Sequence, residues 1–170
     1  LNIISSDKKY LEGLFFPDSY YFYKNTSDIE ILQNSHKVLN RKLQSAWDNR
    51  SAELPYKNMY EALIIASIIE KEVGVLEEAS IIAGVFVNRM NVGMPLQSDP
   101  TVIYGMGKRF NGNITRKDLK KDTPYNTYTR KGLPPSPISL PSLNSIEAAL
   151  NPAQTNALYF VAKGNRMHHF

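Results

Sequence analysis

Cysteine is absent from the 170 residues, and no stretch approaches the roughly 20 apolar residues that a membrane-spanning helix needs. Without thiols the chain has no disulfide framework, no thiolate zinc site and no cysteine nucleophile. The opening residues lack the pattern of a signal peptide. No Ser-His-Asp order, phosphate loop or metal-ligand motif is present either. The sequence therefore predicts neither a metal nor another cofactor.

Charge of neither sign dominates, because 20 basic residues face 16 acidic ones and the formal net charge is +4. This mild positive field suits an anionic polymer such as nucleic acid or the cell wall, and its sign alone does not choose between them. Lys117, Lys120 and Lys121 lie beside Asp118 and Asp122 in the sequence, which is typical of a solvated face. We expect no nucleic-acid partner.

The length and composition predict one domain that covers residues 1–170. Hydrophobic residues make up 42% and charged residues 21% of the chain, as in ordinary globular proteins. A chain of this length can bury most of the surface that its unfolded form exposes. Neither disorder nor a fibrous repeat is indicated.

Helical patterns fill the first half of the chain. Apolar residues at helical spacing follow a cap at Ser27 and continue to Trp47, with His36 on the same stripe as a structural residue. A second helix begins after Asn58, is apolar on nearly every side and is ended by Gly74. A third helix runs from about residue 77 to Gly93.

The remaining segments predict an α+β fold, with helices around a buried helix and a small sheet from N- and C-terminal strands. The aromatic residues 11–22 indicate a short strand and turn, or alternatively a groove wall on which sugars stack. Residues 95–105 read as a loop that delivers Asp99 to the cap of a short helix. Residues 106–141 form a long loop of functional type, 142–150 a helix, 157–162 a buried strand, and the last four residues another strand.

Glu70 is the leading candidate for acid/base chemistry. This carboxylate follows eight nearly all-apolar residues near the C-terminal end of the second helix. Desolvation and the helix dipole should both raise its pKa, as a general acid requires. The alternative is that Glu70 only begins the polar last turn of the helix. Glu72 is the second choice, and because it points about 200° away we expect it to meet solvent or a basic neighbour.

Several motifs, in the same order over nearly the whole chain, resemble the catalytic region of the endolytic murein transglycosylases, the MltG/YceG-like family. The resemblance implies a lysozyme-like helical heart and assigns the catalytic acid to the first Glu of a Glu-Lys-Glu motif, here Glu70. The shared motifs are Glu12-Gly13 with Phe16-Pro17-Asp18, residues 66–72, Val87-Asn88-Arg89, residues 96–105, Tyr125-Asn126-Thr127-Tyr128, Gly132-Leu133-Pro134-Pro135, His168 and Phe170.

What the resemblance implies is an enzyme that cuts the MurNAc-GlcNAc β-1,4 bond inside peptidoglycan strands, leaving 1,6-anhydro-MurNAc ends and terminating strand growth. It also implies a catalytic domain on the outer face of the cytoplasmic membrane, held by an N-terminal anchor and a LysM-like domain that this chain lacks. Peptidoglycan synthases are possible partners. The expected substrate-binding residues are Glu12, Gln97, Ser98, Asp99, Tyr125, Asn126, Thr127 and Tyr128.

Two other functions stay open from the sequence. A hydrolytic muramidase would use water and a second carboxylate, for which Asp99 is the candidate. A non-catalytic peptidoglycan-binding module would bind strands without forming any product.

Overall fold

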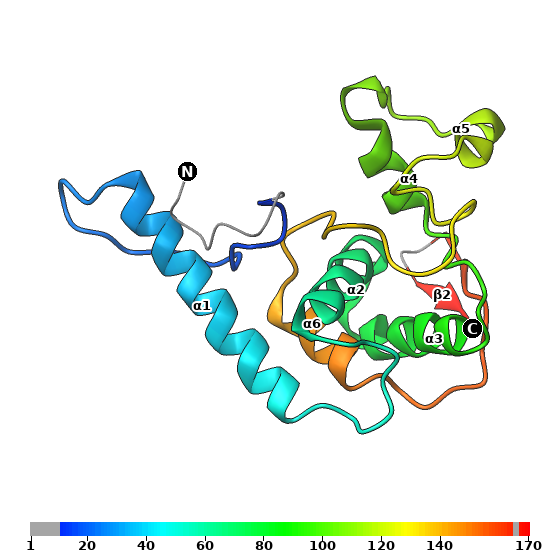
Figure 1. Cartoon of the computed structure of the whole chain (residues 1–170), viewed down its shortest axis with the longest axis horizontal. Coiled ribbons are helices and arrows are strands. Elements are labelled where there is room, and N and C mark those ends of the chain that lie inside the picture. Colours follow the sequence, from blue (N-terminus) through cyan, green and yellow to red (C-terminus); the bar gives the residue numbers. More distant parts are fainter. Residues whose placement is uncertain (1–10, 165–166) are drawn as a thin grey trace.

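The computed structural model describes residues 11–164 and 167–170, which are mostly helical (Figure 1). The described helices and strands are α1 (Asp28–Asp48), α2 (Met59–Glu72), the 3-10 turn η1 (Leu76–Glu78), α3 (Ala79–Asn91), α4 (Asp99–Met106), the 3-10 turn η2 (Gly107–Arg109), α5 (Arg116–Lys120), α6 (Leu143–Leu150), β1 (Val161–Ala162) and β2 (His168–His169).

Helix α2 forms the centre of the core, as its all-apolar pattern predicts. It begins where the Asn58 side chain accepts a hydrogen bond from the Glu61 amide at 3.0 Å. All eight residues from Ala62 to Ile69 are buried. The helix contacts α1, α3, α4 and α6, so nearly every side of it meets another element (Figure 1). The two glutamates at its end are thereby fixed relative to four other helices.

Helix α1 packs through only part of its apolar stripe. Ser27 caps it, and Leu39 and Leu43 are buried, whereas Ile29 and Leu32 near its start are exposed. The His36 ring lies 2.8 Å from the Leu14 carbonyl oxygen. The structural role predicted for His36 is therefore confirmed.

Helix α3 begins at Ala79, because Glu77 and Glu78 belong to the preceding 3-10 turn. Gly84 lets another segment approach α3 closely, since a Cβ atom there would lie 2.5 Å from the Ala153 carbonyl oxygen. The Asn88 side chain then donates to the carbonyls of Thr155 and Ala157 at 2.7 and 3.0 Å. The chain after α6 is thus held along α3 by side chains.

This attachment explains why the strand prediction for 157–162 is largely wrong. Only Val161–Ala162 is a strand, and both of its residues are exposed. It pairs antiparallel with β2, which confirms the predicted strand at the C-terminal end. The carbonyls just before β1 accept hydrogen bonds from side chains of α3, so they do not need a neighbouring strand.

The prediction of an N-terminal strand is also wrong. The described residues before α1 form turns and bends. The Phe16 carbonyl accepts hydrogen bonds from the hydroxyls of Tyr20 and Ser35 at 2.7 and 3.0 Å. The α+β class is confirmed, with both strands of the sheet at the C-terminal end.

None of the helices within the described residues combines the length and the apolar character that crossing a bilayer requires.

Candidate active site

Helix α2 ends with two carboxylates that face different elements. Residues two apart on a helix point about 200° from each other. Glu70 accordingly contacts the start of α6, whereas Glu72 contacts the start of α4. Because α4 and α6 lie on different sides of α2 (Figure 1), the two side chains have different surroundings. These surroundings decide which carboxyl suits acid/base chemistry.

Glu70 is bound at the N-terminus of α6. Its Oε2 atom accepts hydrogen bonds from the Ser142 amide, the Ser142 hydroxyl and the Ser145 hydroxyl at 2.9, 2.6 and 2.7 Å. Burial acts to raise the pKa of Glu70, but these hydrogen bonds and the charge of Lys71 outweigh burial and lower that pKa. The expectation of a raised pKa is therefore wrong, because donors that favour the carboxylate surround it.

Glu72 has the opposite character. It is half-buried, and its Oε1 atom accepts a hydrogen bond from the Ser98 hydroxyl at 2.5 Å. Burial raises the pKa of the Glu72 carboxyl, and the negative charge of Asp99 adds to this effect. The Ser98 hydrogen bond and the positive charges of His168 and Arg89 act in the opposite direction without cancelling it. A carboxyl of this kind holds its proton to a higher pH than an exposed one.

A chain of buried hydroxyls holds the Ser98 side chain in place. The Ser98 amide donates to the Thr127 hydroxyl at 3.0 Å, and the Thr101 hydroxyl donates to the Ser98 carbonyl at 2.7 Å. The hydroxyl oxygens of Thr101 and Thr127 are 2.9 Å apart. Because the Thr101 hydroxyl already donates its hydrogen to the Ser98 carbonyl, the Thr127 hydroxyl is the donor of this pair. Ser98 is thereby aimed at Glu72 and is buried away from a substrate.

Asp99 and Tyr128 lie near Glu72, where Asp99 is exposed and Tyr128 is partly buried. The Tyr128 hydroxyl donates to Asp99 Oδ1 at 2.5 Å. Burial raises the pKa of Tyr128, and its hydrogen bond to Asp99 raises it further, so the phenol stays protonated. Asp99 is exposed and is the first residue of α4, where the cap is Ser98; the predicted cap position is wrong by one residue.

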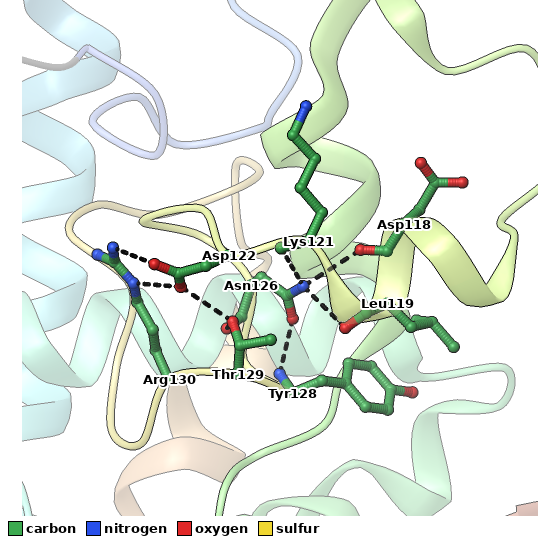
Figure 2. Close-up of polar contacts among 8 residues, drawn as sticks. All are labelled: Asp118, Leu119, Lys121, Asp122, Asn126, Tyr128, Thr129 and Arg130. Carbon is green, nitrogen blue, oxygen red and sulfur yellow. Dashed lines mark hydrogen bonds and ion pairs between the residues drawn. The ribbon is translucent and has the colours of Figure 1, made fainter.

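Asn126 and Thr127 are buried next to Tyr128 and hold the surrounding backbone in place. The Asn126 side-chain nitrogen donates to the carbonyls of Asp118, Leu119 and Lys121, and its oxygen accepts from the Tyr128 amide at 2.8 Å (Figure 2). Asn126 and Thr127 are 1% and 2% exposed. The expectation that these two residues contact substrate is not supported, because their polar atoms are already bound inside the protein.

The other predicted binding residues lie apart from one another. Gln97 is exposed, with a left-handed backbone (φ 52°) next to Ser98. The Tyr125 hydroxyl lies 2.6 Å from the Ser136 hydroxyl, and its ring packs on Tyr104 with centroids 4.8 Å apart. Glu12 precedes Gly13, at which an added Cβ atom would lie 2.3 Å from the Pro137 side chain. Binding roles for Gln97, Tyr125 and Glu12 stay predictions.

Two features near Glu72 were not predicted as parts of the site. Arg89 is 5% exposed and donates to the carbonyls of Leu158 and Leu96, each at 2.6 Å, which fixes the chain on both sides of the site. His168 contacts Glu78 through its ring and its amide at 2.8 and 2.9 Å. In the sequence, the only indication of Arg89 and His168 is that both lie within the motifs that carry the family resemblance.

Among the residues that the structure describes, no group of His, Cys, Asp and Glu side chains has an arrangement that could hold a metal ion.

Comparisons with known proteins place the chain in a family. The YceG-like family matches residues 2–170. The endolytic murein transglycosylase of Bacillus subtilis is 40% identical over 157 residues, and that of Streptococcus pneumoniae strain D39 is 36% identical over 156. The crystal structure of a YceG-like protein from Listeria monocytogenes superposes with a TM-score of 0.78 at 37% identity and covers 95% of this chain. The chain belongs to the YceG-like family.

The matches cover most of this chain but only part of each relative. They span 91% and 89% of this chain, but 42% of the Bacillus protein and 28% of the Streptococcus protein. The match to the Listeria structure spans 53% of that chain. This chain therefore corresponds to one portion of longer proteins.

Proposed function

We propose that this chain is the catalytic portion of an endolytic murein transglycosylase, a lyase that cuts the MurNAc-GlcNAc β-1,4 bond within peptidoglycan strands. The observation that carries the proposal is Glu72, a half-buried carboxyl with a raised pKa between Ser98 and the Asp99–Tyr128 pair. The names of two relatives at 36% and 40% identity support the substrate and the reaction.

Within this proposal, Glu72 is the acid/base. The family resemblance assigns this role to Glu70, whereas the surroundings of the two carboxyls favour Glu72 as the general acid. Glu70 Oε2 already accepts three hydrogen bonds that favour its charged form. Glu72 has Ser98 on Oε1, which leaves Oε2 to carry the proton.

The proposed reaction uses one carboxyl twice. Protonated Glu72 donates its proton to the glycosidic oxygen as the bond from that oxygen to C1 of MurNAc breaks. The muramyl 6-hydroxyl oxygen then bonds to C1, and the Glu72 carboxylate takes the proton that this hydroxyl loses. The product is a 1,6-anhydro-MurNAc end, no water is consumed, and Glu72 returns to its acid form. General acid–base catalysis of this kind contributes typically about 100- to 10,000-fold.

Asp99 and Tyr128 stabilise the charge that develops on the sugar. The transition state of glycosidic cleavage resembles an oxocarbenium ion. The exposed Asp99 carboxylate lies close enough to Glu72 to act on its pKa, and the Tyr128 hydroxyl fixes its orientation. A negative group in this position favours the positive sugar ring.

Mass spectrometry of muropeptides released from uncrosslinked strands tests the proposed reaction. We expect products one water lighter than those of hydrolysis. Products that carry a reducing end would instead identify a muramidase that activates water with Asp99 as the second carboxylate. Strand binding without any product would identify a binding module.

Ser98→Ala is expected to lower activity and to shift its pH dependence. The Ser98 hydrogen bond lowers the pKa of Glu72, so its loss raises that pKa further. Since cleavage needs the protonated acid, the fall of activity at high pH moves to a higher pH in the variant. Ser98→Thr keeps the hydroxyl, so its activity should fall at the same high pH as that of the wild type. If the activity of Ser98→Ala falls at the same pH as that of the wild type, Ser98 does not act on the catalytic carboxyl.

We also propose that, in the intact protein, the domain faces the extracytoplasmic space, is held at the cytoplasmic membrane by an N-terminal anchor and a LysM-like domain, and works beside peptidoglycan synthases. This part of the proposal rests on the family resemblance alone.

A further inference from the structure

The positive charge of the chain is concentrated in one lobe, residues 106–131, which we call the basic lobe. It contains eight basic and two acidic residues, a formal charge of +6, whereas the whole chain carries +4. The other 144 residues together therefore carry −2. All eight basic side chains are exposed; they are Lys108, Arg109, Arg116, Lys117, Lys120, Lys121, Arg130 and Lys131.

The two acids of the basic lobe are bound within the lobe, and the formal charge of +6 already includes them. Asp118 is engaged with Thr115, whose amide and hydroxyl both donate to its carboxylate. Asp122 forms an ion pair with Arg130 at 2.8 Å (Figure 2). Within the described part of the chain, this is the only ion pair recorded for a Lys or Arg side chain. The solvated face predicted for these lysines is thus a surface with a large positive excess.

Packing and hydrogen bonds hold the backbone of the basic lobe in a defined path. Helix α4 packs against the returning chain at Gly105, where an added Cβ atom would lie 3.1 Å from the Thr123 hydroxyl. The Asn126 amide binds the last carbonyls of α5 and the residue after it (Figure 2). The lobe projects from the helical core in Figure 1, together with the preceding helix α4.

The basic lobe begins beside the proposed site. Helix α4 leads from Asp99 directly to η2, which contains Lys108 and Arg109. The returning chain passes from Lys120 and Lys121 to Tyr128, which bonds Asp99. A strand held at Glu72 therefore has this positive surface next to it, and such a field attracts anionic groups.

We propose that the basic lobe binds the carboxylates of the stem peptides that substrate strands carry. This inference rests on the proposed function and names the part of the substrate that the lobe recognises. The glycan backbone of peptidoglycan is largely uncharged, whereas its stem peptides end in free carboxylates. Lysine and arginine are the natural partners of such groups. The enzyme then prefers strands with stems over strands from which the stems have been removed.

Binding measurements with the triple variant Lys108→Gln, Lys117→Gln, Lys120→Gln test this inference. The probes are uncrosslinked strands with their stems and the same strands after an amidase has removed the stems. Both proteins carry Glu72→Gln so that the probes stay intact. We expect the parent to bind stem-bearing strands about tenfold more tightly than bare strands, with a preference that weakens as salt screens the charges. The triple variant should lose most of this preference.

The matched control changes the same net charge elsewhere. Lys24→Gln, Lys37→Gln, Arg41→Gln removes three exposed charges on α1 and the loop before it, and it should leave the preference intact. Equal losses in both variants, or a parent that does not distinguish the two probes, would overturn the inference. Binding to vesicles of anionic lipid but not to stem-bearing strands would overturn it in favour of a membrane surface.

Cleavage assays separate this inference from the proposed function. If the wild-type chain cuts strands with and without stems equally well, the proposed function is supported and the inference about the basic lobe is contradicted. If the wild-type chain forms no product yet prefers stem-bearing strands, the recognition surface is supported and the catalytic proposal is contradicted.

Discussion

Glu72→Gln is expected to lower the rate of strand cleavage by about 100- to 10,000-fold. The amide can accept the Ser98 hydrogen bond but can neither give a proton to the glycosidic oxygen nor take one from the 6-hydroxyl. Because Glu72 carries a desolvation cost as a carboxylate, its neutral replacement should leave the free energy of unfolding unchanged or slightly higher. Rates of product release from uncrosslinked strands give the measurement.

Glu70→Gln is the matched comparison, because it makes the same isosteric change on the same helix two residues earlier. It removes a charge that accepts three hydrogen bonds at the start of α6. We expect a loss of about 1 kcal/mol of stability, with cleavage retained. The pKa of Glu70 is lowered, so its stabilisation is present above its ordinary value of 4.5 and is lost as pH falls below it.

The pair of variants decides between the two carboxylates. An inactive, folded Glu70→Gln together with an active Glu72→Gln would return the acid/base role to Glu70. Thermal unfolding of both proteins shows whether either loss of activity comes from loss of the fold. Retention of near-normal activity by both variants would contradict a general acid at this end of α2.

Asn126→Ala is expected to be the most destabilising change in the basic lobe, with a loss of about 3 kcal/mol or more. The substitution removes the donors for three carbonyls at the end of α5 and the acceptor of the Tyr128 amide (Figure 2). Asn126 is 1% exposed, so water cannot readily replace these bonds in the native structure. Chemical denaturation provides the free energy of unfolding.

The same substitution should also reduce cleavage. Tyr128 would lose the bond that fixes its backbone, and through Tyr128 the position of Asp99 would be less defined. Thr129→Ala is the control, because Thr129 is exposed and its hydroxyl bonds the exposed Asp122 at 3.1 Å. It should change the free energy of unfolding by less than about 0.5 kcal/mol. An Asn126→Ala variant as stable as this control would contradict the role of Asn126 as a structural hub.

The helical elements could be predicted because their signals are local. Caps at Ser27 and Asn58 and the apolar run from Ala62 to Ile69 determine α1 and α2 without reference to the rest of the chain. The C-terminal strands were less predictable. An apolar run such as 157–162 reads as a buried strand, yet the side chains of Asn88 and Arg89 satisfy the carbonyls before β1.

Asn126 shows how a residue type can mislead. In a loop, asparagine beside tyrosine is as typical of a turn or a sugar-binding site as of a structural hub. Its role follows from the carbonyls that surround it, which belong to residues five to eight positions earlier. Only the path of the loop decides whether such carbonyls point toward the amide.

The sequence by itself determined that a buried helix ends in two carboxylates and that a polar, basic segment follows it. It also determined, through the helical period, that Glu70 and Glu72 point in different directions. Only the tertiary structure decided what each of them meets. Ser98 lies 26 residues after Glu72, and Ser142 lies 72 residues after Glu70. The pKa of a carboxyl depends on the donors, charges and burial around it, and here the packing of α4 and α6 on α2 supplies them.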